Sequence, residues 1–222
     1  MFCLKMVTQK AFTLAEVLIA LVIIGVVAAI TVPTIMQNQN DKALRVALRK
    51  SHSVIAQAMN RYYIDNGEHV SYDTDLYNNF FLKYFNVATS KIDSEDLENT
   101  KYQNYSRKNS YVASQYYFSS EDSVILTDGM MMGPYLTSGS YNVLGVIVDV
   151  NGPYKKPNRL GKDTFFFEIY YERTTKNTII QGEAIPGGTK NKSFMVGSGY
   201  CSTTSGGVLN GLGCTSQALY EK

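Results

Sequence analysis

The chain has 222 residues, with 21 lysines and arginines against 19 aspartates and glutamates, and its formal net charge at pH 7 is +2. So small an excess of positive charge gives no support for a protein that binds nucleic acid directly. His52 and His69 are the two histidines, and the sequence contains no nucleophile elbow, phosphate loop or zinc-ligand spacing. We therefore expect no catalytic residues and no enzyme.

The first predicted element is an apolar helix over residues 12–35, whose single charged side chain is Glu16. At about 1.5 Å per residue this helix spans roughly 36 Å, which exceeds the hydrocarbon core of a bilayer at about 30 Å. A secretory signal peptide has a shorter apolar region and a small-x-small cleavage site, of which residues 27–31 are a poor version. Lys5 and Lys10 precede the span, so we expect the N-terminus inside and the large C-terminal part outside the cytoplasmic membrane.

Residues 11–19, Ala-Phe-Thr-Leu-Ala-Glu-Val-Leu-Ile, resemble the processing site of type IV pilins and type II secretion pseudopilins. In that family a prepilin peptidase removes a short basic leader, the new N-terminus is methylated, and the helices pack together inside a filament. The resemblance implies cleavage between Ala11 and Phe12, N-methylation of Phe12 and a role for Glu16 in assembly. Gly25 and Pro33 lie where the family often loosens or kinks its helix. Ala11 is a departure, because glycine is most frequent before the cut.

Glu16 has a physical interpretation that does not depend on the family. An unpaired carboxylate inside a packed helix bundle costs several kcal/mol, so it needs a cationic partner. Cleavage before Phe12 creates such a partner, the new terminal amine, which a neighbouring subunit would present to Glu16. The alternative is a glutamate that lies at the lipid headgroups of a signal anchor.

Removal of residues 1–11 would change the composition of the chain. It would take away Lys5, Lys10 and Cys3, which leaves 19 basic and 19 acidic side chains and two cysteines, Cys201 and Cys214. Two cysteines with no ligand cluster around them, in an extracytoplasmic domain, favour a disulfide over a metal or redox site. A C-terminal loop closed in this way is common in pilins. On a chain-entropy estimate the bond contributes on the order of 3 kcal/mol.

Residues 36–66 are predicted to continue the helix with an amphipathic pattern. Apolar side chains three, four or seven residues apart form one stripe: Leu44, Leu48, Ile55, Met59 and Tyr62. Such a stripe is typical of a helix that is covered by a sheet. Asn66-Gly67 offers a left-handed cap, so the two halves should form a single helix from about Thr13 to Asp65.

Residues 67–222 are expected to form a globular β-rich head, which gives an α+β, pilin-like architecture. Residues 70–120 form a variable insertion, with a short amphipathic helix at 76–85 and a polar surface loop from Thr89 to Ser110. Its tyrosines could belong to a sugar-binding surface, but sheet edges and subunit contacts are favoured for them. They are Tyr102, Tyr105, Tyr111, Tyr116 and Tyr117.

Short β-branched and aromatic runs separated by turn residues predict six strands, at residues 111–118, 123–127, 130–136, 143–150, 164–171 and 178–183. The later strands should form an antiparallel sheet against the second half of the helix. The side chains expected to face the helix, or else their alternates, are Val146, Val148, Phe165, Phe167 and Ile169.

Residues 148–165 resemble a strand-loop-strand pattern found in the heads of pilin-like proteins, and carry four oxygen donors: Asp149, Asn151, Asn158 and Asp163. Some pseudopilins bind calcium in this general region. Calcium takes six to eight oxygen ligands, and two carboxylates are few for that purpose. Asp and Asn also cap turns by accepting backbone hydrogen bonds, and we favour this interpretation. No other cofactor is expected.

These patterns together predict a prepilin-like structural subunit of a type IV pilus or a related pseudopilus. Its partners would be prepilin peptidase, copies of itself, other pilins or pseudopilins, and the membrane. Cleavage of 11 residues from 222 leaves a mature length of 211, and the insertion at 70–120 favours a minor or specialised subunit. The alternative is a membrane-anchored extracytoplasmic binding module that does not polymerise.

Overall fold

The computed structural model describes residues 12–90, 92–137, 141–173 and 178–220. The chain divides into two compact units between Ala43 and Leu44. Helix α1, Leu14–Asn66, contributes residues to both units. The predicted single helix from about Thr13 to Asp65 is therefore confirmed, with each end shifted by one residue. Ala11 and the rest of the expected leader lie outside the described residues.

The N-terminal part of α1 is exposed from its start to residue 40, and Pro33 lies inside the helix. Proline has no backbone N–H, so the carbonyl four residues earlier loses its helical partner. Around this point the hydroxyl groups of Thr31 and Thr34 donate to the carbonyls of Val27 and Ile30, at 2.9 and 3.3 Å. In length and composition this helix could cross a membrane.

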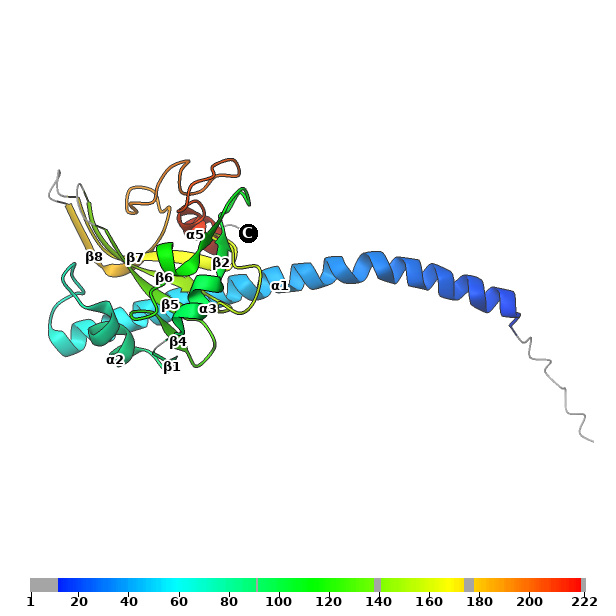
Figure 1. Ribbon diagram of the computed structural model, residues 1–222, viewed down its shortest axis with the longest axis horizontal. Coiled ribbons are helices and arrows are strands. Elements are labelled where there is room, and N and C mark those ends of the chain that lie inside the picture. Colours follow the sequence, from blue (N-terminus) through cyan, green and yellow to red (C-terminus); the bar gives the residue numbers. More distant parts are fainter. Residues whose placement is uncertain (1–11, 91, 138–140, 174–177, 221–222) are drawn as a thin grey trace, which may run out of the picture. The chain divides into compact units, whose positions relative to one another are not determined.

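The head is built around a six-stranded antiparallel sheet in the order β1-β4-β5-β6-β7-β8 (Figure 1). Its strands are β1 Val87–Thr89, β4 Val124–Leu126, β5 Met131–Thr137, β6 Tyr141–Asp149, β7 Thr164–Arg173 and β8 Thr178–Pro186. A small hairpin pairs β2, Lys101–Gln103, with β3, Ser110–Val112. The short helical elements are η1 Tyr77–Phe81, α2 Leu82–Tyr84, α3 Ser94–Asn99, α4 Ala113–Tyr116, η2 Leu212–Cys214 and α5 Thr215–Tyr220.

One face of the sheet packs against α1. The buried helix residues are Leu48, Ser51, Ile55, Ala58, Met59 and Tyr62. They share a core with Val146, Val148, Phe165, Phe167 and Ile169, so the predicted sheet face and helix stripe are confirmed. His52 lies at the border of this core, where its Nε2 donates to the Ala184 carbonyl at 3.0 Å and its ring stacks on Phe167 at 5.4 Å. Because a carbonyl only accepts, this contact assigns the ring proton to Nε2.

The opposite face of the sheet is also covered. Ile147 and Phe166 point to a second core that contains Leu97, Tyr102 and Leu212. Phe165, Phe166 and Phe167 are all buried for this reason, because a sheet covered on both faces buries consecutive side chains. The alternate side chains on these strands, which point away from α1, therefore form a core of their own.

Two expectations for the insertion are wrong, and a third is confirmed with a different helix type in its first turn. Residues 89–110 are not a surface loop, because they contain α3 and β2 and bury Leu97 and Tyr102 completely. Residues 111–118 are not a strand, since β3 ends at Val112 and the helical turn α4 follows. Residues 76–85 are helical as expected, but the first turn, η1, is a π-helix. Leu97, Tyr102 and Ala113 all pack into the core on one face of the sheet, so burial in that core accompanies both departures from the local pattern.

Candidate functional site

The start of α1 is closed by a reciprocal pair of hydrogen bonds between Thr13 and Glu16. The backbone N–H and the hydroxyl of Thr13 donate to Glu16 Oε2 at 2.8 and 2.9 Å, and the backbone N–H of Glu16 donates to the Thr13 hydroxyl at 3.3 Å. This is a capping box, which satisfies two N–H groups that a helix start leaves unpaired. The carboxylate is therefore fixed at the first turn with its second oxygen, Oε1, accepting no hydrogen bond from the described residues.

This local partner was not predicted, although Thr13-x-x-Glu16 is a recognisable capping-box signature. The cap does not cancel the charge of Glu16, because a hydroxyl and an amide are neutral donors. A cation from another molecule could still approach Oε1. Thus the structure places Glu16 at an exposed helix start, next to Phe12, which is 85% exposed.

Gly25 and Pro33 both lie within the continuous helix α1. A Cβ built on Gly25 would meet no heavy atom within 4 Å, so packing within this chain does not require glycine there. Glycine and proline each weaken a helix, through backbone entropy and a missing N–H respectively. A kink or a loosening at these two positions stays a prediction.

In the head, the structure brings Asp149 and Asp163 together beside the hairpin β2–β3. Asp149 Oδ1 accepts hydrogen bonds from the backbone N–H groups of Asn151 and Gly152, at 3.2 and 2.9 Å. Its other oxygen accepts from the Tyr102 hydroxyl at 2.5 Å. Asp149 thus caps the turn after β6 and ties the insertion to the sheet.

Asp163 acts in the same way on the following loop. Its carboxylate accepts from the backbone N–H groups of Asn158 and Arg159, both at 2.7 Å, and from the Thr164 hydroxyl at 3.2 Å. Asn158 has a φ of 46°, and its side-chain amide donates to the Pro153 carbonyl at 2.9 Å. These contacts support the interpretation of the segment as capped turns.

The same four residues fit calcium poorly. The carboxylates of Asp149 and Asp163 already accept hydrogen bonds from backbone N–H groups. A cation would have to displace these donors. The amide oxygens of Asn151 and Asn158 are buried and accept no hydrogen bond from the described residues. They would add two ligands where calcium takes six to eight. Within the described ranges no group of three or more His, Cys, Asp or Glu side chains is placed to hold a metal ion.

Burial dominates the electrostatics of this pair. It raises the pKa of Asp149 to about 7, with a further contribution from the charge of Asp163. Burial also raises the pKa of Asp163. The pKa of Tyr102 is raised well above its usual value by burial and then by the charge of Asp149, so its hydroxyl remains a donor. Two buried acids whose charges interact in this way favour protonation of one of them near neutral pH.

Glu168 is a third buried acid, and it was not among the predicted site residues. It lies on β7 and is fully buried. It accepts from the hydroxyl of Ser193 at 2.5 Å, and the backbone N–H of Phe194 donates to both of its oxygens at 2.9 and 3.0 Å. Burial raises its pKa to about 7. Glu168 thereby attaches the loop after β8 to the sheet. No sequence pattern marked it, because its partners lie about 25 residues away.

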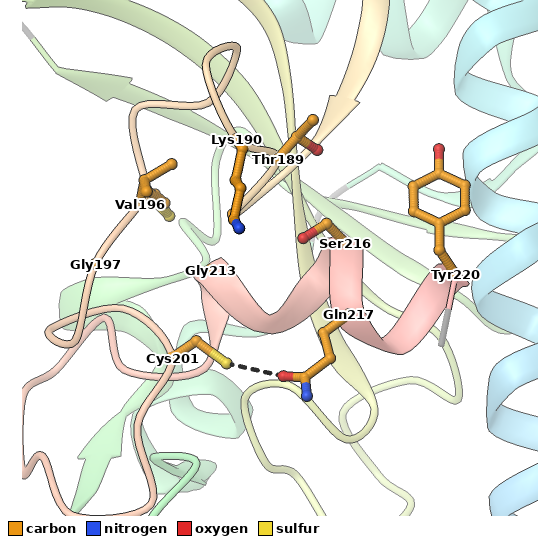
Figure 2. A pocket seen from close by; sticks show the side chains of 11 residues that line it. Thr189, Lys190, Val196, Gly197, Cys201, Gly213, Ser216, Gln217 and Tyr220 are labelled. Carbon is orange, nitrogen blue, oxygen red and sulfur yellow. Dashed lines mark hydrogen bonds between the residues drawn. The ribbon is translucent and has the colours of Figure 1, made fainter. Parts of the chain in front are cut away.

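The C-terminal loop contains the predicted disulfide, Cys201–Cys214, with a Cα–Cα distance of 5.0 Å. Buried Asn210 organises the same loop, because its side chain bonds the backbone of Ser202 and Ser205. Beside the disulfide lies a pocket of about 600 Å³, shown in Figure 2. Lys190 points into it from the loop after β8, and Ser216, Gln217 and Tyr220 line it from α5. Its polar groups are one amine, hydroxyls and an amide.

Two comparisons with known proteins found similarity, one of them at the N-terminus. Residues 6–32 match the family model described as the prokaryotic N-terminal methylation motif. The chain is similar to the type II secretion system core protein G of Klebsiella michiganensis, with 32% identity over 69 residues that cover 31% of this chain and 48% of that protein. It thus spans about half the length of this curated relative. No solved structure matches the chain. The predicted resemblance to pilins and pseudopilins is confirmed.

Proposed function

We propose that this chain is a structural subunit of a type IV pilus or a related pseudopilus. Prepilin peptidase would cut it between Ala11 and Phe12, the amine of Phe12 would be methylated, and α1 would pack with copies of itself and with other pilins. The observation that carries the proposal is the coincidence of the methylation motif at residues 6–32 with an exposed apolar helix start capped at Thr13 and Glu16.

The state of Glu16 supports a role in assembly. Its carboxylate is held in place by Thr13 on one oxygen and lacks a donor from the described residues on the other. An ammonium group that reaches Oε1 would form a charge-assisted hydrogen bond without disturbing the cap. The terminal amine created before Phe12 has the right chemistry, and a neighbouring subunit would supply it. This pairing would set the axial register of the subunits.

The proposed location follows from the same helix. The chain would first span the cytoplasmic membrane once, with its N-terminus inside and its head outside, and would then leave the membrane for an extracytoplasmic filament. The proposed role is mechanical and not catalytic. A mature length of 211 residues after loss of 11 from 222, and the structured insertion around α3 and α4, favour a minor or specialised subunit. Gly25 and Pro33 would let α1 bend or loosen during packing.

A membrane-anchored binding module that does not polymerise is the second candidate. The pocket of about 600 Å³ beside the disulfide favours it, because Lys190, Ser216 and Gln217 could bind a small polar or anionic molecule. Binding and polymerisation are not mutually exclusive, so the pocket alone does not decide between them. Cleavage and methylation of the N-terminus distinguish the two candidates.

The experiment that tests the proposal is mass spectrometry of the full-length protein recovered from membranes and from sheared filaments. We expect loss of residues 1–11 and a methylated Phe12, with the processed form enriched in the filament fraction. An intact Met1 in both fractions would overturn the pilin assignment and leave the anchored binding module. Processed protein with a methylated Phe12 that is recovered from membranes alone would also contradict polymerisation.

A further inference from the structure

The pocket beside the disulfide has the size of a small-molecule site. Its volume of about 600 Å³ lies within the range of about 300–1,000 Å³ that is typical of such sites. Residues 188–190 and 195–197 line it from the loop after β8, and residues 216, 217 and 220 line it from α5. All of them belong to the same compact unit, residues 44–222, so the pocket is formed by the head alone.

Hydrogen bonds fix the backbone of both segments that line the pocket. In the loop, the backbone N–H of Phe194 donates to the two oxygens of buried Glu168 at 3.0 and 2.9 Å, and Met195 beside it is fully buried. At the start of α5, the backbone N–H of Ser216 donates to the Gly187 carbonyl at 2.9 Å. A pocket whose walls are already ordered loses little conformational entropy when it binds a ligand.

Two glycines allow these segments to meet at the pocket. Gly188 has a φ of 87°, and a Cβ built on it would collide with the Gly213 carbonyl. A Cβ built on Gly213 would in turn lie 2.5 Å from the Met195 carbonyl. Any side chain at either position would push the loop and the segment before α5 apart, so the shape of the pocket depends on glycine at both.

The charge of the pocket comes from Lys190, the one charged side chain among the described residues that line it. Figure 2 shows this side chain pointing toward Ser216. Over the described ranges no ion pair involves Lys190, whereas Lys192 is paired with Glu183 at 2.6 Å. An ammonium group donates three hydrogen bonds and accepts none, and an anionic acceptor would bind it most strongly.

The remaining lining indicates what else the anion would carry. Met195 and Val196 contribute aliphatic surface and Cys201 contributes the disulfide. Val196 is 48% exposed, so a ligand with an apolar body would remove this surface from water. A phosphate group carries a charge of about −1.5 to −2 at pH 7, which is more than one lysine balances. A carboxylate carries a single charge and matches the single ammonium group.

We propose that this pocket binds a small organic carboxylate. The Lys190 ammonium and the Ser216 hydroxyl would donate hydrogen bonds to the carboxylate oxygens. The apolar body of the ligand would contact Met195, Val196 and the disulfide. This inference adds a binding site to the head and does not depend on filament assembly.

Ligand-observed NMR of the full-length protein in detergent micelles tests the proposal, with micelles alone as the background. The three probes share one ring and differ in charge: benzoate, benzamide and benzylamine. Benzoate should bind with a Kd of about 1 mM, as expected for so small a molecule, and about fivefold more tightly than either of the others. Lys190→Gln should weaken benzoate binding by about tenfold, and Ser216→Ala by about threefold. Lys190→Arg keeps the charge and should retain binding.

Lys101→Gln is the matched control, because Lys101 is exposed on β2 and does not line the pocket. Formation of the Cys201–Cys214 bond would show that each variant is folded. Equal binding of the three probes, or no benzoate binding up to about 10 mM, would overturn the proposal. An equal loss in Lys101→Gln and Lys190→Gln would overturn it in favour of non-specific attraction to surface charge.

Inorganic phosphate is the last competitor to test. If it displaces benzoate at an equal concentration, the pocket is a phosphate site and the carboxylate assignment is wrong. None of these outcomes affects the proposed function, which is tested separately by cleavage and methylation at Phe12.

Discussion

Thr13 and Glu16 hold each other at the first turn of α1, with the Thr13 N–H donating to the carboxylate at 2.8 Å and the Glu16 N–H donating to the hydroxyl at 3.3 Å. A glutamate at this position therefore has two separable properties. Its oxygen caps the helix, which a neutral amide can also do, and its charge can attract a cation, which a neutral amide cannot. The two properties can be tested one at a time.

Glu16→Gln should keep the cap and remove the charge. Glutamine is accepted at this position of a capping box, so we expect the helix start and membrane insertion to be unchanged while filament recovery falls sharply. Carbonate extraction of membranes checks insertion, and shearing checks assembly. Thr13→Ser, which keeps the hydroxyl, is the control and should assemble normally. Wild-type assembly of Glu16→Gln would remove the charge-pairing argument.

Glu168 should make the stability of the head depend on pH. Burial raises its pKa in the folded protein to about 7, from the ordinary value of 4.5 for glutamate. The folded state therefore binds the proton more tightly than the unfolded state. The contribution to stability is full below about pH 4.5 and is lost as the pH rises through about 7. The free energy of unfolding should thus fall by about 3 kcal/mol over this range on account of Glu168.

Chemical denaturation of wild type and Glu168→Gln at pH 4.5 and pH 8 measures this contribution. The glutamine variant should lose less stability between the two pH values, because it carries no titrating group at this site. Asp149 titrates in the same range but is present in both proteins. The difference between their pH-dependent losses of stability therefore reports Glu168 alone. Parallel pH profiles for the two proteins would contradict the prediction.

Tyr102→Phe removes one donor from the buried Asp149 carboxylate. The hydroxyl lies 2.5 Å from Asp149 Oδ2, and loss of a partner from a buried acceptor costs about 1–3 kcal/mol. The pKa of Asp149 is about 7, so the cost should be larger at pH 8, where the carboxylate is ionised, than at pH 5. Thermal unfolding at both pH values measures it. Tyr116→Phe, at an exposed position, should be neutral, and an equal loss at both pH values would refute the explanation.

The sequence predicted well what depends on regular patterns. The length of α1, its buried stripe and five of the six predicted strands follow from periodicity and turn residues, and each is present. It failed for the insertion, because Leu97 and Tyr102 are single apolar side chains in a polar stretch and no local pattern reveals that both are buried. The buried role of Glu168 was not predicted for a related reason, since its partners come from a distant loop.

Chelation should leave the head unchanged. The carboxylates of Asp149 and Asp163 accept hydrogen bonds from backbone N–H groups at 2.7–3.2 Å, so the turns hold without a cation. We expect the same melting temperature with EGTA and with added calcium. A melting temperature that falls with EGTA and recovers with calcium would reverse the assignment and make Asn151 and Asn158 candidate ligands.

Replacing both cysteines, Cys201→Ser with Cys214→Ser, should lower the free energy of unfolding by about 3 kcal/mol, because the bond closes a short loop in the unfolded chain. The folded loop should keep its shape, since Asn210 is fully buried and bonds the backbone of Ser202 and Ser205 at 2.7–2.9 Å. Denaturation measures the first effect and proteolysis between residues 202 and 210 the second. Asn210→Ala should show the converse, a loop that is cut quickly although the disulfide is intact. Rapid cleavage of the serine variant under native conditions would show that the disulfide, and not Asn210, holds the loop.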